Sequence, residues 1–471
     1  MPPANGHKRC CNLDCMQITS SRREFLNSLA SGVVASALPA SAAPSRRPNI
    51  LYILADDLGY GDLRCYNPAS KVPTPNLDRF ATQGVRFTDA HSPSAVCTPT
   101  RYGIMTGRYC WRSRLKTSVL NGYSPALIEP GRLTVPAMLK QQGYRTAGIG
   151  KWHLGLGNRE PTDYSQPLRP GPLEAGFDSY YGIPASLDMP PYLYFENDRA
   201  VAQPTAHVDD TPDRRGVFWR GGAAAPGFRH IDVLPRLADK AVDYLRAGTP
   251  QPFYLYLALT APHTPWLATP EFRGKSAAGE YGDFVAMVDG TVGRVLRLLD
   301  ERKLTGDTLV VFASDNGAYW LPEDIARWPG RIHPGTTCAE TTCLVDLMAT
   351  LADLTGYRLP RDAAEDSWSM LPALLGERLD KPIREATVHH SSQGHFSLRQ
   401  GPWKLNVGRG SGGFTPPVQY TPKPGEPEGE LFNVAEDLAE TRNLYQERPE
   451  IVARLKALLE KYQRQGYSRP L

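Results

Sequence analysis

The segment Asn49-Ile50-Leu51-Tyr52-Ile53-Leu54 is a nearly continuous apolar run that leads directly into Ala55-Asp56-Asp57. A run of this length without polar alternation is typical of a strand that is buried on both faces of a sheet. Similar runs occur at Arg145–Ile149, Phe253–Leu259 and Thr308–Ala313, and stretches with helical periodicity lie between them. This alternation predicts an α/β fold with a central sheet covered by helices.

A change in the pattern of predicted strands and helices along the chain predicts its domain organisation. Residues 44–375 carry the alternation of strands and helices, whereas short strands and turns over 376–471 predict a smaller C-terminal α+β subdomain. Residues 157–230 are rich in Pro, Gly, Asp and Tyr and predict long surface loops. Helices are expected at Thr74–Phe80, Thr134–Gln142, Val233–Leu245, Tyr281–Lys303, Leu344–Leu354 and Pro449–Gln463.

Residues 1–43 have the features of a targeting segment. Ser21-Arg22-Arg23-Glu24-Phe25-Leu26 is a twin-arginine pattern, an apolar run follows at Leu29–Leu38, and Ala40-Ser41-Ala42 is a cleavage-type site. The apolar run is too short for a stable membrane span. We therefore expect recognition by the twin-arginine export machinery and a location in the bacterial periplasm or outside the cell.

Composition excludes some classes of protein and draws attention to the cysteines. The 471 residues are 41% hydrophobic and 22% charged, with a formal net charge of +4 and no block of basic residues, so nucleic acid is not an expected partner. After residues 1–43, an odd number of cysteines remains, which leaves at least one thiol unpaired in an exported protein. We expect that one to be Cys97; the others are Cys65, Cys110, Cys338 and Cys343.

The pentapeptide Cys97-Thr98-Pro99-Thr100-Arg101 is expected to place a thiol at the start of a helix, because Pro99 suits the first helical position. The positive end of the helix dipole favours a thiolate or a bound oxyanion there. A helix cap with Cys97 as a small buried apolar side chain is the alternative. The pentapeptide alone leaves both interpretations open.

Acidic and amide side chains follow two of the apolar runs. Asp56 and Asp57 follow the first, and Asp315 and Asn316 follow the last. Ligands bind at the carboxyl ends of strands in open α/β sheets, and an all-oxygen set suits Ca²⁺ or Mg²⁺ rather than zinc. Helix caps and turns are the alternative interpretation of each pair alone.

Basic side chains follow the other two runs. Lys151 and His153 come after one strand at alternate positions, so an extended backbone would turn both toward one site. His263 lies between two prolines after another strand. A single histidine is commonly structural, but a cationic cluster beside a metal site would stabilise charge on a tetrahedral anionic ester.

An ordered set of motifs resembles one known family. Cys97–Arg101, followed by Met105-Thr106-Gly107-Arg108, is similar to the Cys-x-Pro-x-Arg…Thr-Gly-Arg element of the type I sulfatases, members of the alkaline phosphatase-like superfamily. The similarity continues over nearly the whole chain after residue 43, through Pro48–Ile50, Asp56–Gly59, Gly150–Gly155, Pro262–Pro265, Ser314–Gly317, Arg327–Gly330, Glu430–Asn433 and Glu440–Leu444.

The resemblance implies an alkaline phosphatase-like α/β fold with a large mixed central sheet. It also implies that a maturation enzyme converts Cys97 to Cα-formylglycine, whose hydrate attacks sulfur in the sulfate ester of a small molecule or glycan. One Ca²⁺ ion per chain, or Mg²⁺ as the alternative, would be held by that side chain and by Asp56, Asp57, Asp315 and Asn316.

The resemblance further assigns roles to the basic residues. Arg101 and Lys151 would steady the formylglycine and its charge. His263 would help to protonate the leaving alcohol. His153 would take the proton from the second hydroxyl, which expels sulfate and regenerates the aldehyde.

One segment departs from the family pattern. Ala318–Ala326 contains neither a lysine nor Glu-Gly-Gly, whereas the family has a sulfate-contacting lysine in this region. The leading prediction is hydrolysis of aryl or carbohydrate sulfates, with activity reduced if this loop is required. A binding protein for sulfated glycans without turnover is the main alternative, and a phosphate ester hydrolase is a further one. The aromatic side chains of the 157–230 segment fit either stacking on a substrate ring or surface packing; they are Tyr180, Tyr181, Tyr192, Tyr194 and Trp219.

Overall fold

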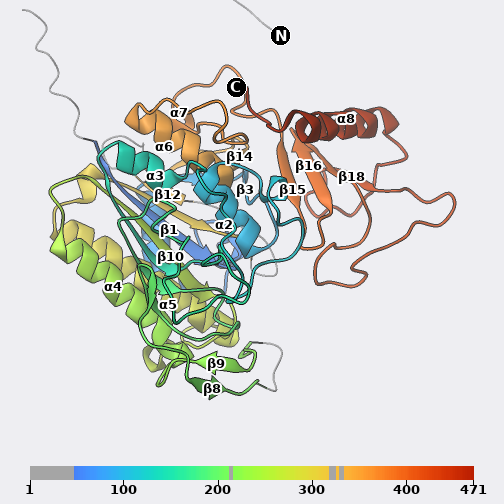
Figure 1. Cartoon of the computed structure of the whole chain (residues 1–471). Helices are drawn as coiled ribbons and strands as arrows, with labels where there is room; N and C mark the ends of the chain where they lie inside the picture. The colour runs from blue at the N-terminus through green and yellow to red at the C-terminus, as the bar shows by residue number, and fades with distance from the viewer. Residues whose placement is uncertain (1–46, 212–215, 318–324, 328–333, 471) are drawn as a thin grey trace, which may run out of the picture. The chain divides into compact units, whose positions relative to one another are not determined.

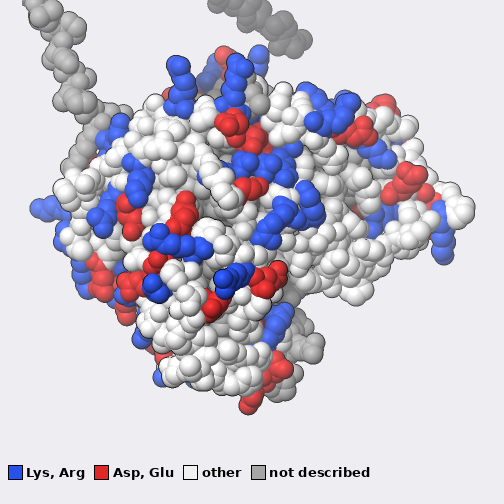
Figure 2. Space-filling model, viewed as in Figure 1, with Lys and Arg blue, Asp and Glu red and all other residues white. Residues whose placement is uncertain are grey.

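The computed structural model describes residues 47–211, 216–317, 325–327 and 334–470. The predicted targeting segment, most of Ala318–Ala326 and the Arg-Trp-Pro-Gly motif after Arg327 lie outside the described residues. The range Arg47–Leu471 forms one compact unit. Within the described part, no helix combines the length and apolar character that crossing a membrane requires. On the face drawn in Figure 2, acidic and basic side chains are interspersed.

A ten-stranded mixed sheet forms the centre of this unit (Figure 1). Strand β1 (Asn49–Asp56) lies between β10 (Phe253–Pro262) and β11 (Thr308–Ser314), parallel to both, and β4 (Arg145–Lys151) continues the parallel set beside β10. The full order is β13 (Thr336–Cys338), β2 (Val85–Phe87), β12 (Ile325–Arg327), β11, β1, β10, β4, β5 (Ser179–Ile183), β6 (Phe195–Glu196) and β7 (Arg199–Ala200).

Both faces of the sheet are covered, as the apolar run in β1 predicts. Ile50, Tyr52 and Leu54 belong to one buried cluster, and their alternate neighbours Leu51 and Ile53 belong to another. The first cluster includes side chains of α2 (Cys97–Thr106), α3 (Val135–Gln141) and α6 (Leu347–Thr355). The second includes side chains of α1 (Pro75–Thr82), α4 (Val233–Ala247) and α5 (Gly279–Glu301). The α/β prediction is thereby confirmed, with helices on either side of the sheet (Figure 1).

The C-terminal part contains a separate antiparallel sheet with α8 (Pro449–Gln465) packed on it. Its strands are β15 (Thr387–His390), β16 (Phe396–Gln400), β17 (Trp403–Asn406) and β18 (Glu430–Asn433). Val388, Leu398, Leu405 and Leu431 join Leu455 of α8 in a third buried cluster. The remaining elements are α7 (Leu371–Leu374) and two short ribbons, β3 (Ala90–His91) with β14 (Thr342–Cys343) and β8 (Ala206–Val208) with β9 (Gly222–Ala224).

Two expectations are corrected. The 157–230 segment is not only surface loop, because it contributes β5 to β9, and Tyr180, Tyr181, Tyr192 and Tyr194 in it are buried. Cys97 is not singled out by an odd cysteine count, because all five cysteines in the described part are free thiols, Cys338 and Cys343 included.

Candidate active site

The carboxyl ends of the four adjacent parallel strands bring the predicted residues together. Asp56 ends β1, Lys151 ends β4, and His263 directly follows β10. Asp315 and Asn316 directly follow β11. These strands are parallel neighbours, so their ends meet at one edge of the sheet, where the first residue of α2 also lies within ligand distance.

Arg101 and Lys151 enclose the carboxylate of Asp56. Lys151 Nζ donates to both oxygens of Asp56, at 2.7 and 2.8 Å. Arg101 Nη2 donates to Asp56 Oδ1 over 3.1 Å, and Arg101 Nε donates to Asp315 Oδ2 over 2.9 Å. All four side chains are fully buried. Burial opposes ionisation of Asp56, but the charges of Lys151 and Arg101 outweigh it and hold its pKa well below the usual range.

Cys97 is the first residue of α2. Pro99 is therefore the third helical residue, whereas the sequence predicted it at the first helical position. Its missing N–H still falls among the unbonded donors of the first turn. Burial raises the pKa of the Cys97 thiol well above its usual range; Lys151 opposes this shift and Asp315 adds to it. Burial and the neighbouring carboxylates therefore favour the neutral thiol in the unmodified side chain, whereas the sequence favoured a thiolate or a bound oxyanion at this position.

The acidic residues could hold a metal ion together with Cys97. Ligand atoms of Asp56, Cys97 and Asp315 lie within 4.8 Å of one another, and so do those of Asp57, Cys97 and His263. Asn316 Nδ2 donates to Asp57 Oδ1 over 2.5 Å, whereas Asn316 Oδ1 is buried without a hydrogen-bond partner in the described part. An unsatisfied buried amide oxygen beside three carboxylates fits a hard cation.

The pKa shifts of Asp315 and Asp57 also fit a cation-binding site. Burial raises the pKa of Asp315 to about 7 despite the nearby Arg101, and the charge of Asp56 adds to the rise. Burial also raises the pKa of Asp57, whose backbone is in the left-handed region with φ 63°. An oxygen-ligated cation would favour the ionised form of both groups.

His153 has one ring nitrogen bonded and the other free. Its Nε2 lies 2.7 Å from Leu120 O, an acceptor, so Nε2 carries the proton. Its Nδ1 is buried without a partner in the described part. Burial lowers the pKa of His153 well below its usual range, and the charges of Lys151 and Arg101 lower it further. The condition under which alternate positions would face one site, an extended backbone, does not hold at His153, which has φ 55°.

His263 has the opposite character. Its Nδ1 donates to Thr264 O over 2.7 Å, and its Nε2 lies 3.7 Å from Asp57 Oδ2. Burial lowers the pKa of His263, but Asp57 and Asp56 outweigh burial and raise it above the usual value. The site thus contains a neutral histidine with a free lone pair and a histidine that favours its protonated form.

Sequence analysis assigned no role in the site to three further residues, which are Thr98, Leu120 and Asp188. Thr98 Oγ1 accepts from Leu120 N over 3.2 Å, so Leu120 links the start of α2 to His153 through its backbone. Asp188 is buried and is among the charges that raise the pKa of His263. A backbone contact has no sequence signature, and Asp188 lies in no recognisable motif.

Comparisons with known proteins identify the family of the chain. A family model described as Sulfatase matches residues 48–357. The N-acetylgalactosamine-6-O-sulfatase of Bacteroides thetaiotaomicron is 32% identical over 484 aligned residues, covering 88% of this chain and 93% of that protein. The steryl-sulfatase of Mus musculus is 34% identical over 429 residues, covering 73% of this chain and 68% of that protein.

Solved structures have the same architecture. One from work on glycosaminoglycan metabolism by Bacteroides thetaiotaomicron superimposes with a TM-score of 0.79 at 31% identity, covering 88% of this chain and 99% of that one. A sulfatase structure from Pseudoalteromonas sp. gives a TM-score of 0.72 at 23% identity, covering 88% and 90%, and supports the fold alone.

Proposed function

This chain belongs to the sulfatase family and is a sulfate ester hydrolase, and we propose that it cleaves carbohydrate sulfates with a formylglycine made from Cys97. The observation that carries the proposal is the placement of Cys97. It is the first residue of a helix, beside the buried carboxylates of Asp56 and Asp315 and the partly buried one of Asp57, with histidines of opposite protonation behaviour nearby. This arrangement suits a nucleophile that must lose a proton and a leaving group that must gain one.

The proposed cofactor is one Ca²⁺ ion, with Mg²⁺ as the alternative. The residues that would hold it are Asp56, Asp57, Asp315, Asn316 and the modified side chain at Cys97. The ion would stabilise charge on the sulfate group and make a nearby hydroxyl more acidic. The unpartnered Asn316 Oδ1 and the raised pKa of Asp315 support this assignment.

Arg101 and Lys151 keep the acidic residues in place. Each donates to Asp56 through a fully buried contact, and Arg101 also donates to Asp315. Rigid donors and charges of this kind need no rearrangement when charge develops during reaction. We therefore assign both residues to charge stabilisation around the modified side chain.

The two histidines divide the proton transfers. His263 carries a proton on Nδ1, which donates to Thr264 O, so its Nε2 is the nitrogen that donates a proton to the leaving oxygen. His153 is neutral, and its free Nδ1 is the nitrogen that accepts a proton from the second hydroxyl when sulfate is expelled. This division requires the raised pKa of His263 and the lowered pKa of His153.

The proposed substrate class rests on the relatives. The Bacteroides relative is named for the 6-O-sulfate of N-acetylgalactosamine, and this chain covers 93% of it. We take N-acetylgalactosamine 6-sulfate as the first substrate to test. The twin-arginine pattern supports a location outside the cytoplasm, and because that pathway carries folded proteins, a dedicated maturation enzyme would convert Cys97 before export.

The test combines mass spectrometry of the Cys97 peptide with sulfate release from this sugar and from p-nitrophenyl sulfate. We expect formylglycine at position 97, hydrolysis, and loss of both in Cys97→Ala. Cys110→Ala is the matched control, because Cys110 is an equally buried thiol outside the site. An unmodified Cys97 with no hydrolysis, in a host that modifies other sulfatases, would overturn the proposal.

The same measurements distinguish the alternatives. Binding of sulfated glycans without turnover would indicate a binding protein, which the absence of a lysine in Ala318–Ala326 keeps open. Two zinc ions per chain with phosphate ester hydrolysis would indicate a phosphoesterase.

A further inference from the structure

Trp219 differs from the other aromatic side chains of its segment. Tyr180, Tyr181, Tyr192 and Tyr194 are buried, whereas Trp219 is partly exposed. Its indole ring stacks on His230, with centroids 4.5 Å apart and planes 17° apart, and its Nε1 donates to Asp209 O over 3.0 Å. The ring is therefore held in a fixed orientation while part of it faces solvent.

Arg220 follows Trp219 and is anchored at one end of its guanidinium. Arg220 Nη1 donates to the carboxylate of Asp188 and to Asp188 O, and Asp188 is buried. The Arg220 side chain is 50% exposed, and its hydrogen bonds to other described residues use Nη1. Nε and Nη2 are thus donors without a partner in the described part of the chain.

The segment that carries these residues is attached to the catalytic loop at His263. Thr264 Oγ1 donates to Gly216 O over 2.6 Å, and Trp266 N donates to the same oxygen over 3.0 Å. From there the chain runs through Trp219 and Arg220 into β9, in the ribbon at the bottom of Figure 1. Trp219 and Arg220 therefore lie three and four residues after a backbone carbonyl that is hydrogen-bonded to the loop carrying His263.

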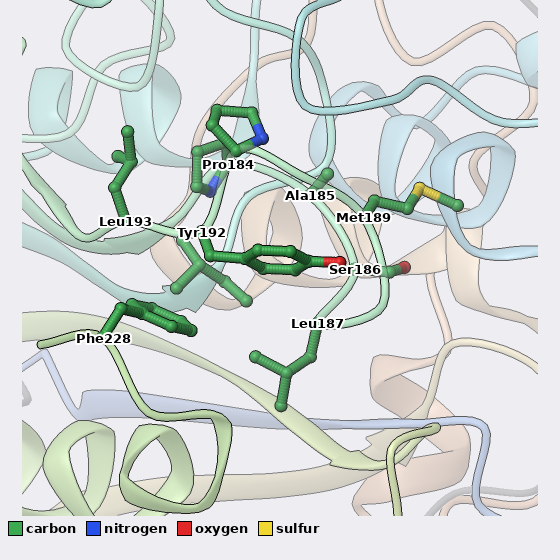
Figure 3. A pocket seen from close by; sticks show the side chains of 10 residues that line it. Pro184, Ala185, Ser186, Leu187, Met189, Tyr192, Leu193 and Phe228 are labelled. Atoms are coloured by element: carbon green, nitrogen blue, oxygen red, sulfur yellow. The ribbon is translucent and has the colours of Figure 1, made fainter. Parts of the chain in front are cut away.

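One small cavity near Tyr192 is too small to bind a sugar. It has a volume of about 10 Å³ and is lined by apolar residues around Tyr192, including Leu187 and Phe228 (Figure 3). That volume holds at most about one water molecule. This cavity is therefore not the sugar site, whereas Trp219 and Arg220 present exposed side-chain surface.

We infer that Trp219 and Arg220 form the binding wall for the sugar ring that leaves with the ester oxygen, and that Asp188 positions Arg220. The indole would stack on the C–H face of the ring, and Arg220 would donate to hydroxyl or acetamido oxygens. This inference rests on the proposed function and adds the residues that select a carbohydrate over a simple aryl leaving group.

The test compares kcat/KM for N-acetylgalactosamine 6-sulfate with that for p-nitrophenyl sulfate. Because the aryl substrate lacks the ring oxygens, Arg220→Ala should lower the sugar-to-aryl ratio about 10-fold or more. Arg220→Lys should give a sugar-to-aryl ratio between those of Arg220→Ala and the unsubstituted protein, since Lys, unlike Arg, cannot donate two parallel hydrogen bonds. Asp188→Asn should raise KM for the sugar more than it lowers kcat, as expected of a positioning residue. Trp219→Ala should lower kcat/KM for the sugar sulfate, because the indole no longer stacks on the sugar ring.

Arg169→Ala is the matched control. Arg169 is a 54% exposed arginine that contacts Asp198, beside the turn between β6 and β7. It should leave the ratio unchanged, with thermal unfolding checked for every variant. An unchanged ratio in Arg220→Ala, or an equal fall in Arg169→Ala, would overturn the inference.

A binding measurement separates failure of this inference from failure of the proposed function. Calorimetry with the sugar sulfate on Cys97→Ala and on Cys97→Ala/Arg220→Ala requires no turnover. Weaker binding by the double variant, about 10-fold or more, supports the wall even if the chain hydrolyses nothing. Equal affinities, or no binding by either chain, would overturn it.

Discussion

Lys151 Nζ lies 2.7 and 2.8 Å from the two carboxylate oxygens of Asp56, and both side chains are fully buried. Lys151→Met removes the charge that Asp56 needs in this environment. Because removal of one partner leaves a buried charge poorly compensated, we expect a loss of about 3–5 kcal/mol in the free energy of unfolding, together with loss of sulfate release. Urea unfolding in EDTA measures the first effect.

The matched control for this prediction is Lys140→Met. Lys140 contacts Asp178 at 2.8 Å, but its side chain is 50% exposed, so the pair is screened by water. We expect a loss of at most about 1 kcal/mol. Equal losses in the two variants would contradict the view that burial makes the Lys151 contact costly to break.

Asp57→Asn should make the metal-free chain more stable and less responsive to calcium. The carboxyl of Asp57 is partly buried near Asp56, its pKa is raised, and its φ of 63° suits Asn. We expect a gain of about 0.5–2 kcal/mol in EDTA, a size common when strained functional residues are replaced. The stabilisation by Ca²⁺, about 2.7 kcal/mol at 100 times Kd for one site, should largely disappear.

Thermal unfolding with EDTA and with added Ca²⁺ measures both effects. Asp62→Asn is the control, because Asp62 accepts from Gly59 N and from Tyr281 and is not among the proposed ligands. It should keep the calcium response. A full calcium response in Asp57→Asn would count against Asp57 as a ligand.

The parts of the site that the sequence predicts correctly are those that follow long strands. Runs such as Asn49–Leu54 and Thr308–Ala313 report burial on both faces without knowledge of their partners, and polar residues directly after them must lie at the sheet edge. The expected ends of β1, β4, β10 and β11 differ from the observed ends by one to three residues.

The parts that sequence reasoning missed depend on distant partners. The left-handed backbone at His153 goes with hydrogen bonds from Trp152 N to Ile183 O and from His153 N to Pro184 O, which come from β5 and the loop after it. Strand β5 itself lacks a long apolar run and exists because β4 pairs with it. Local pattern carries no information on such tertiary contacts.

Asp289 of α5 should stabilise the fold by capping α1. Its carboxylate accepts from Leu77 N over 2.8 Å and from Asn76 N over 3.2 Å, at a helix start where no N-cap side chain forms this bond. Asp289→Ala leaves these donors unsatisfied, and we expect a loss of about 1–3 kcal/mol. Asp300→Ala, on the exposed side of the same helix, should change stability by less than about 0.5 kcal/mol.

Chemical unfolding measures both variants, and sulfate release below the unfolding temperature should be unaffected in either. Equal stabilities would contradict the capping role. A specific loss of activity in Asp289→Ala, without a loss of stability, would contradict a purely structural role.

Gly150 should be indispensable for the alignment of Lys151. It has φ 123°, and a Cβ atom there would lie 1.7 Å from Ala258 O on the adjacent strand. Gly150→Ala must therefore push β4 away from β10, at a cost of about 3 kcal/mol or more, and displace Lys151 from Asp56. Gly131 also has a positive φ, but a Cβ atom there would meet no neighbouring atom. Gly131→Ala therefore measures the cost of backbone strain alone, about 1–2 kcal/mol. If urea unfolding showed equal losses of stability in Gly150→Ala and Gly131→Ala, contact with Ala258 would not be the cause of the loss in Gly150→Ala. The steric explanation further requires sulfate release to fall only in Gly150→Ala.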